Sequence, residues 1–356
     1  MKKLKIVVYA ITKNEEKFVD RWVDSMSEAD EIYVLDTGST DKTVKLLKKR
    51  GVNVFVKKFK NWRFDVARNE SLNLVPEDVD LCVCTDLDEV FEFGWRKKLE
   101  ENYNGSTRVR YNYNWSLDEF NKPLVNFYLD KIHVRNGYKW THPVHEVLMP
   151  INIEEKYLTI EDITLNHYPD STKSRGSYLP LLELSVKEDP FDDRNMHYLG
   201  REYMYYGKWN ECIDTLIKHL NLESATWKDE RSASMRFIAR SYKNLGRNKE
   251  AEMWYKRAHK EAEYLREPLV ELAILYNDEG KWEKAIEYLI KAKKISNKYK
   301  SYINEVFAWD TTIDDLLSIA YFNLGLKDEA LFYINKVIEE KPNDERILMN
   351  KELMEK

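Results

Sequence analysis

The chain has few of the residues that cross-link or interrupt a fold: 3 cysteines, 11 glycines and 9 prolines in 356 residues. Three cysteines do not make a disulfide framework, so we expect a reducing compartment and core positions for Cys82 and Cys84. No apolar run approaches the roughly 18–20 residues of a membrane-spanning helix. The apolar stretch 6–11 behind the basic N-terminus is too short for a signal peptide. We therefore expect a soluble, cytoplasmic protein.

Charge of neither sign dominates. The chain has 57 basic and 62 acidic residues and a formal net charge of -5. This balance gives no electrostatic footprint for nucleic acid, so no nucleic-acid partner is expected. The length allows two domains, each with its own core.

Strand-like and helix-like segments alternate up to about residue 175. We expect strands at 4–11, 31–35, 52–56 and 81–84, with helices near 15–26, 40–50 and 64–74. This succession predicts an α/β domain over residues 1–175 with a mixed, mainly parallel sheet. The alternating aromatic and polar residues of 107–115 predict antiparallel strands that extend the sheet.

After a linker at 176–194, a helical repeat is expected over 195–350. Four glycines each have a tyrosine four residues before them and a small residue five residues after them: Gly207, Gly246, Gly280 and Gly325. One glycine spacing, 34 residues, is the period of tetratricopeptide repeats. These coincident offsets favour a tetratricopeptide-like array over an irregular helical bundle. Such arrays bind peptides or subunits or brace a neighbouring domain, and exposed tryptophans at 209, 254, 282 and 309 would allow a homodimer through the repeats.

Acidic residues follow the fourth predicted strand: Asp86, Asp88 and Glu89. In mostly parallel sheets, ligands collect at the carboxyl ends of the strands. Because alternate residues of an extended segment point to the same side, Asp86 and Asp88 can approach one hard cation. Such a cation would in turn hold a diphosphate. An isolated Asp-x-Asp is more simply a solvated turn, but other motifs accompany this one.

No Gly-x-Gly-x-x-Gly follows the first strand, and no P-loop is present. A dinucleotide oxidoreductase or a P-loop nucleotidase is therefore disfavoured. Instead, the second strand ends at Asp36, whose carboxylate can accept hydrogen bonds from NH or hydroxyl groups of a ligand. Ser39 or Thr40 can cap the helix that follows.

In content and order, these motifs resemble those of family 2 glycosyltransferases with the A-type nucleotide-sugar fold (GT-A), which is Rossmann-like. The matching segments are 14–16 (Asn-Glu-Glu), 36–43, 67–69 (Ala-Arg-Asn) and 86–89. Segment 140–146 resembles the family's acceptor-side His-Glu segment, and 166–168 resembles the histidine region that follows it. Leu87 stands where alanine is usual, and Thr37 also departs from the commonest form.

The resemblance implies roles for individual residues. The donor-binding residues would be Thr12, Asn14, Glu15, Asp36, Arg68, Asp86 and His145. Mn²⁺ or Mg²⁺ would be held by Asp86 and Asp88, with His167 as an extra ligand. Family members usually invert the anomeric centre, so Glu146 would be the acceptor-side base beside the catalytic Asp88. Asp118 and Glu119 are the alternative bases.

UDP-sugars are the family's commonest donors, and glucose, N-acetylglucosamine and galactose would each fit. A glycosyltransferase domain followed by tetratricopeptide repeats also resembles bacterial peptide S-glycosyltransferases, which favours a peptide or protein acceptor. A saccharide or lipid-precursor acceptor is the alternative within the enzyme class. A non-catalytic repeat scaffold with a vestigial domain is the alternative from another class. A nucleotidyltransferase would be expected to have a glycine- and basic-rich loop after the first strand, where 12–15 reads Thr-Lys-Asn-Glu.

Overall fold

The computed structural model describes residues 3–170 and 176–356, which form two compact units. One unit ends at Ser185 and the other begins at Val186, except that Lys300–Tyr302 group with the first. The segment predicted as a linker, 176–194, contains helix α5 (Tyr178–Glu188) and the first residues of α6. The predicted boundaries at 175 and 195 stay predictions.

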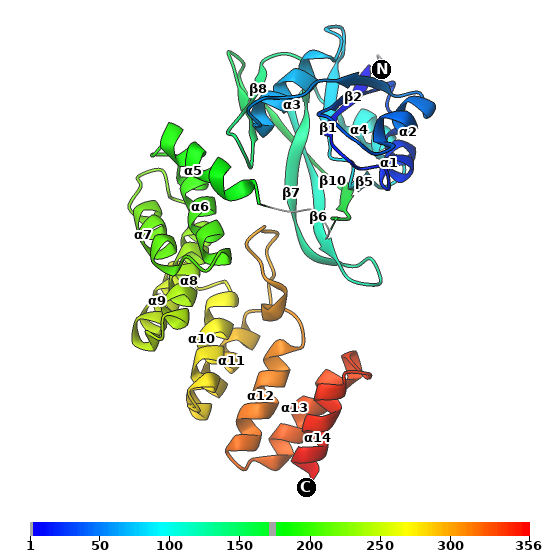
Figure 1. Ribbon diagram of the computed structural model, residues 1–356. Coiled ribbons are helices and arrows are strands. Elements are labelled where there is room, and N and C mark those ends of the chain that lie inside the picture. The colour runs from blue at the N-terminus through cyan, green and yellow to red at the C-terminus, as the bar shows by residue number, and fades with distance from the viewer. Residues whose placement is uncertain (1–2, 171–175) are drawn as a thin grey trace. The chain divides into compact units, whose positions relative to one another are not determined.

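The first unit is built on an eight-stranded mixed sheet of order β3-β2-β1-β4-β7-β6-β10-β5 (Figure 1). Four strands are parallel: β1 (Ile6–Thr12), β2 (Glu31–Asp36), β3 (Asn53–Val56) and β4 (Leu81–Cys84). The other four are β5 (Glu89–Phe91), β6 (Arg108–Leu117), β7 (Pro123–Val134) and β10 (Tyr157–His167). β7 is antiparallel to both β4 and β6, whereas β10 is parallel to β6 and antiparallel to β5. The predicted mixed, mainly parallel sheet is confirmed.

Helices and a small second sheet complete this unit. The helices are α1 (Val19–Met26), α2 (Thr43–Lys49), α3 (Phe64–Asn73) and α4 (Trp95–Asn102), and the small sheet pairs β8 (Tyr138–Thr141) with β9 (Val147–Pro150). The first helix begins four residues later than predicted. The reason is that the backbone N–H of Asn14 donates to Ser39 in the loop after β2, and that of Glu15 donates to Thr43, the first residue of α2.

The central strands are buried on both faces, which explains their continuous apolar sequence. Every residue of β1 and β4 is buried. Cys82 and Cys84 are free thiols within this core, as predicted. Burial raises the pKa of Cys82 to about 12 and that of Cys84 to about 11, so both thiols are protonated at neutral pH.

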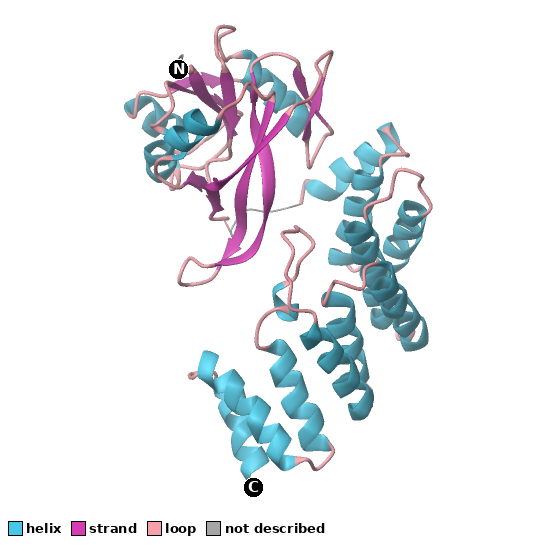
Figure 2. Cartoon of the chain, turned by 180° about the vertical axis from the view of Figure 1, so that it is seen from behind, coloured by secondary structure: helices cyan, strands magenta, loops and turns pink. Residues whose placement is uncertain are grey.

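The second unit consists of helical hairpins, seen as the all-helix part of Figure 2. The pairs are α6 (Asp193–Tyr205) with α7 (Trp209–Leu220), α8 (Lys228–Asn244) with α9 (Asn248–Glu261), α10 (Glu267–Asp278) with α11 (Trp282–Lys294), and α12 (Thr312–Asn323) with α13 (Lys327–Glu340), followed by α14 (Glu345–Glu355). The predicted tetratricopeptide-like array is confirmed.

The four repeat glycines make the turn of each hairpin. All four have positive φ, between 68° and 75°, which a side chain would strain. In every hairpin the N–H after the glycine donates to the carbonyl of the repeat tyrosine, as in a Schellman cap. The small residues five positions after the glycines are fully buried: Cys212, Ala251, Ala285 and Ala330. Gly280 and Gly325 are 45 residues apart because residues 295–311 form a long connection that contains the short helix η1 (Val306–Ala308).

The four repeat tryptophans are not exposed, so that expectation was wrong. Trp254 is buried and the other three are half-buried. The indole of Trp309 donates to the Glu267 carboxylate at 2.9 Å, which is a structural role inside the unit.

Among the described residues, no helix is long and apolar enough to cross a membrane.

A buried polar chain joins β1, β7 and β8. The Trp140 indole donates to the Tyr9 hydroxyl at 2.9 Å, and this hydroxyl lies 2.8 Å from Nε2 of His133. His133 Nδ1 lies 2.8 Å from the carbonyl of Val134, so this nitrogen carries the proton and Nε2 accepts from Tyr9. Burial lowers the pKa of His133 to about 3.

We expect His133 to make the protein acid-labile. The folded state holds the imidazole neutral, whereas the unfolded chain takes up a proton near the ordinary pKa of about 6.5. Stability from this residue is complete above that pH and is lost as the pH falls, by roughly 2 kcal/mol at pH 5. Thermal unfolding of wild type and His133→Gln at pH 7.5 and 5.0 measures this effect. The wild-type advantage should shrink at pH 5.0; an unchanged difference between the two proteins would contradict it.

Candidate active site

Three of the predicted donor-binding residues lie together at the carboxyl ends of β1 and β2. Thr12 and Asp36 are register partners at the last positions of the two strands. The Thr12 hydroxyl donates to the carboxylate of Glu15 at 3.1 Å, and all three residues are buried. The parallel pairing thus gathers them at the sheet edge where ligands of such sheets bind.

The Asp36 carboxylate is satisfied on one oxygen only. Its Oδ1 accepts the backbone N–H groups of Gly38 and Ser39, both at 3.0 Å. Its Oδ2 is buried and has no hydrogen-bond partner among the described residues. Asp36 as a whole is only 1% exposed. An unpaired buried acceptor is costly, so a ligand donor that reaches this oxygen would gain a strong hydrogen bond.

Asn14, another predicted donor-binding residue, is hydrogen-bonded to residues of the loop after β2. Its side-chain oxygen accepts the backbone N–H of Thr40 at 2.7 Å, and its own N–H donates to the Ser39 hydroxyl. Asn14 has a positive φ of 54°, which asparagine tolerates better than most residues. In this structure Asn14 ties the loop after β1 to the loop after β2.

Arg68 on α3 joins two of the predicted catalytic-site acids. Its Nη2 donates to Asp86 Oδ1 at 2.5 Å, and its Nε donates to Glu146 Oε1 at 2.9 Å. A third nitrogen, Nη1, lies 3.5 Å from the sulfur of Cys84. The arginine is 2% exposed. The planar guanidinium suits this arrangement, since its donors point in fixed directions toward separate acceptors.

The two neighbours of Arg68 in the Ala-Arg-Asn motif hold the arginine in position. Ala67 is fully buried, and Asn69 makes two hydrogen bonds to the backbone of Trp140, at 2.8 and 2.9 Å. The N–H of Phe64 donates to the carbonyl of Pro143. α3 therefore holds β8 and the loop that carries Glu146. The sequence identifies the motif, but it does not reveal that Asn69 holds β8.

Lys131 on β7 is a site residue that the sequence did not reveal. Its ammonium lies 3.5 Å from Asp86 Oδ2 and 4.0 Å from Glu89 Oε1. Burial acts to lower the pKa of Lys131, but the charges of Glu89 and Asp86 outweigh it and raise the pKa. No motif marks this lysine, because only the antiparallel pairing of β7 with β4 brings it to the acids.

Asp86 and Glu89 have opposite electrostatic settings. Burial would raise the pKa of Asp86, but the charges of Arg68 and Lys131 hold the pKa well below its usual range. Burial raises the pKa of Glu89, whose oxygens accept from the Tyr113 hydroxyl and from the N–H of Asp86, each at 2.8 Å. The charges of Arg68 and Lys131 thus favour the ionised form of Asp86, while Glu89 braces the turn.

Asp88 and His167 face each other. Asp88 Oδ2 lies 3.5 Å from His167 Nε2, and His167 Nδ1 lies 3.0 Å from the carbonyl of Trp115. Because a carbonyl can only accept, Nδ1 carries a proton and Nε2 is the nitrogen that faces Asp88. Burial acts to lower the pKa of His167, but the hydrogen bond to Asp88 and its charge outweigh it and raise the pKa.

The predicted metal ligands are therefore arranged as a pair and a separate acid. Asp88 and His167 are adjacent, whereas Asp86 lies against Arg68 and Lys131. Within the described ranges, only one group of three or more potential ligands has all its ligand atoms within 4.8 Å of one another, and it belongs to the repeat unit. Metal binding by Asp86, Asp88 and His167 therefore stays a prediction.

The remaining predicted residues lie on loops. His145 precedes Glu146 with a φ of 50°, and its ring packs on Tyr178 at 5.7 Å. Asp118 accepts the N–H groups of Phe120 and Lys122, which shapes the turn between β6 and β7. Glu119 is exposed in the same turn. Neither alternative base shares the Arg68 network that holds Glu146.

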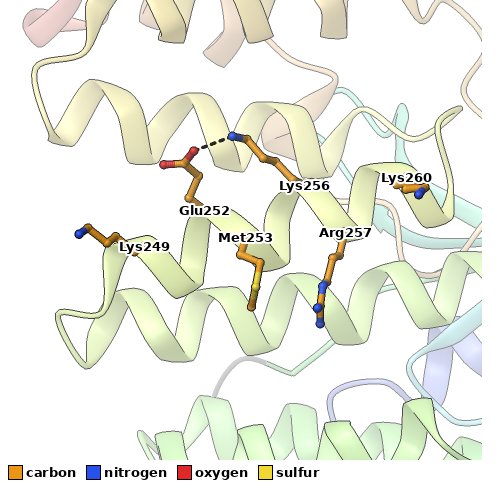
Figure 3. Close-up of a pocket in the computed structure, with 6 residues that line it drawn as sticks. All are labelled: Lys249, Glu252, Met253, Lys256, Arg257 and Lys260. Carbon is orange, nitrogen blue, oxygen red and sulfur yellow. Dashed lines mark hydrogen bonds and ion pairs between the residues drawn. The ribbon is translucent and has the colours of Figure 1, made fainter.

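The repeat unit has a shallow hollow of about 400 Å³ along α9, shown in Figure 3. Its lining residues are Lys249, Glu252, Met253, Lys256, Arg257 and Lys260. Lys256 pairs with Glu252 at 2.6 Å. The hollow is a solvated, mostly basic helix face and includes none of the predicted site residues.

We expect Arg68→Met to destabilise the first unit strongly. The substitution leaves Asp86 and Glu146 without their shared cation, and breaking a buried ion pair typically costs about 3–5 kcal/mol. Arg50→Met is the matched control, because Arg50 pairs with the exposed acids Asp20 and Asp24 and such pairs contribute little. Thermal unfolding of both variants makes the comparison. Equal, small losses in the two variants would contradict the central role of Arg68.

Solved structures that are similar to the chain cover about half of it. A crystal structure of MamA is 20% identical and covers 50% of this chain and 99% of that chain, with a TM-score of 0.40. Pseudomonas aeruginosa pilF is 11% identical over 49% of this chain and 71% of that chain, with a TM-score of 0.39. A thermophilic tetratricopeptide protein of Thermus thermophilus is 20% identical over 49% of this chain and 88% of that chain, with a TM-score of 0.35. No curated protein matches the chain significantly.

The family models match both parts of the chain. Residues 7–150 match glycosyl transferase family 2, and these residues include every strand end and loop of the candidate site except that of His167. Residues 237–262 and 316–344 match the tetratricopeptide repeat. The chain therefore carries a family 2 glycosyltransferase domain followed by tetratricopeptide repeats.

Proposed function

We propose that the protein is a metal-dependent, inverting glycosyltransferase that moves a sugar from a UDP-sugar to a peptide or protein side chain. The family 2 domain supports glycosyl transfer from a nucleotide sugar. The observation that carries the proposal is the Arg68 network, which joins Asp86 and Glu146 at the carboxyl edge of the sheet. It gathers a donor-side acid and an acceptor-side acid in one place.

Donor binding is assigned to the ends of β1 and β2. The unpaired Asp36 Oδ2 would accept an N–H of the base, and uracil offers one such group. Thr12 and Glu15 line the same edge and are already hydrogen-bonded to each other. Recognition of the base by Asp36 would favour uridine over a base that has only acceptors in this position.

The metal-ligand atoms that Asp88 and His167 offer suit a divalent cation. The Nε2 of His167 faces a carboxylate oxygen, and its other nitrogen is oriented by a carbonyl, as is usual for a ligating histidine. Mn²⁺ accepts this mixed set, Mg²⁺ would use mainly the oxygen, and Asp86 is the third ligand of the proposal. When bound, such an ion neutralises charge on the diphosphate leaving group.

Glu146 is assigned as the acceptor base. Its carboxylate takes the proton from the acceptor atom while that atom forms a bond to the anomeric carbon. The bond from this carbon to the donor's phosphate oxygen breaks at the same time, and its electron pair leaves with UDP. A single displacement of this kind inverts the anomeric centre. Arg68 fixes the position of Glu146, and His145 beside it would contact phosphate or orient the base.

The peptide or protein acceptor is proposed from the domain combination. Tetratricopeptide repeats suggest protein interaction, and the chain places such repeats behind a sugar-transfer domain. A homodimer through the repeats and a cytoplasmic location belong to the same proposal.

The test is a thermal-shift and product assay with a panel of nucleotide sugars, with and without Mn²⁺. One donor should raise the melting temperature only when metal is present, and a ligand at 100 times its Kd stabilises by about 2.7 kcal/mol. Asp88→Asn should lose this response. Glu146→Gln should keep it, yet lose roughly 10²–10⁴-fold in turnover, because only the base is removed.

The control for these variants is Asp78→Asn, which changes an exposed acid paired with Lys5. It should behave as the wild type does in every assay. If no donor stabilises the wild type and no nucleoside diphosphate is released, the transferase proposal fails and the repeats become the place to look for function.

A further inference from the structure

Two histidines and a glutamate face each other inside the repeat unit. They come from three successive helices: His197 from α6, His219 from α7 and Glu230 from α8. One ligand atom of each lies within 4.8 Å of the others. Both histidines are fully buried, and Glu230 is 5% exposed. Burying polar groups of this kind in a helical core costs free energy unless they form hydrogen bonds or coordinate a metal ion.

A single hydroxyl orients both imidazoles. The Oγ of Ser234 lies 2.7 Å from His197 Nδ1 and 3.0 Å from His219 Nδ1. A hydroxyl oxygen has two acceptor positions, so it can receive both Nδ1–H groups. In that state both Nε2 atoms present lone pairs, which is how an outer-shell partner prepares histidines for a metal.

Neither the Nε2 of His197 nor that of His219 has a hydrogen-bond partner among the described residues, although both are buried. His219 Nε2 lies 3.4 Å from Glu230 Oε1. Ligands at 2.0–2.1 Å from a tetrahedral ion are about 3.3 Å apart, so this separation matches one edge of a zinc coordination shell.

Charges of both signs surround the cluster. Burial, followed by the charge of Arg201, lowers the pKa of His197 and so favours its neutral form. Arg236 and Arg194 also contribute positive charge, which acts against a bound cation, although Arg236 pairs with Glu271 at 2.7 Å and Glu305 at 2.9 Å. Glu230 supplies the negative charge within the cluster.

The helices that carry the histidines are held closely together. A Cβ at Gly200 would approach the Leu216 side chain to 2.3 Å, so only glycine permits this contact between α6 and α7. Gly200 is one turn from His197, and Leu216 is one turn before His219. The close contact keeps the two imidazoles near each other before any ion binds.

We propose that His197, His219 and Glu230 bind a zinc ion that fastens α6 and α7 to α8, with Ser234 as the residue that positions both histidines. A water molecule would complete the four-coordinate shell. Two imidazoles and one carboxylate suit zinc better than Mg²⁺ or Ca²⁺, which prefer oxygen ligands. The ion would hold the three helices together, and the site shares no residue with the proposed transferase site.

The test measures zinc binding to the full chain after removal of metals with a chelator. The wild type should bind one zinc ion in this site and melt at a higher temperature with it, because the ion binds the folded state. Glu230→Gln and His197→Gln should abolish this binding. Ser234→Ala should weaken it by about 10–100-fold, the usual effect of losing an outer-shell partner.

Two controls separate this site from other zinc binding. Asp88→Asn changes the candidate active site, and His259→Gln changes a histidine of α9 outside the cluster; both should keep the bound ion. If the cluster variants fail to fold, Co²⁺ added to the wild type decides, since tetrahedral Co²⁺ gives a strong visible absorption band. Absence of that band, or zinc binding that survives Glu230→Gln, would overturn the proposal and leave a hydrogen-bonded polar cluster.

Discussion

The candidate active site depends on one buried cation. Arg68 holds Asp86, which follows β4, and Glu146, which precedes β9, although these acids are 60 positions apart in the chain. Two carboxylates in a dry site repel each other, so their proximity requires a positive charge between them. The guanidinium supplies it in a fixed geometry, and Asn69 anchors the same helix to β8. The sheet edge and the acceptor-side loop therefore form one site.

Buried ion pairs also organise the repeat unit. Arg236 and Arg240 both bind Glu271 of α10 and Glu305 of the long connection before α12. These ion pairs add to the packing of Ala308 and Trp309, which also fasten the long connection to the array. The polar cluster of His197, His219 and Glu230 lies earlier in the array. Both clusters place charged or polar residues where small or apolar residues are usual.

Local sequence patterns predicted the fold, whereas several contacts of the two sites depend on long-range pairing and could not be predicted. Apolar runs predicted β1 and β4, and the offsets around Gly207 and its equivalents predicted the hairpins, because both depend on neighbours in sequence. Lys131 could not be predicted, since its charge reaches Asp86 only through the register of β7 on β4. The shared hydrogen bonds of Ser234 were equally hidden, because they depend on three helices meeting. The start of α1 was missed because the side chains of Ser39 and Thr43, which are distant in sequence, bind its expected first turn.

The most direct test of the central claim is a crystal structure of the full chain with UDP and Mn²⁺. The account predicts the nucleotide at the carboxyl ends of β1, β2 and β4, with a base N–H on Asp36 Oδ2 and the ion on Asp88. Glu146 should remain on Arg68, on the acceptor side of the diphosphate. A nucleotide bound elsewhere, or one that leaves Asp36 Oδ2 without a partner, would contradict the account.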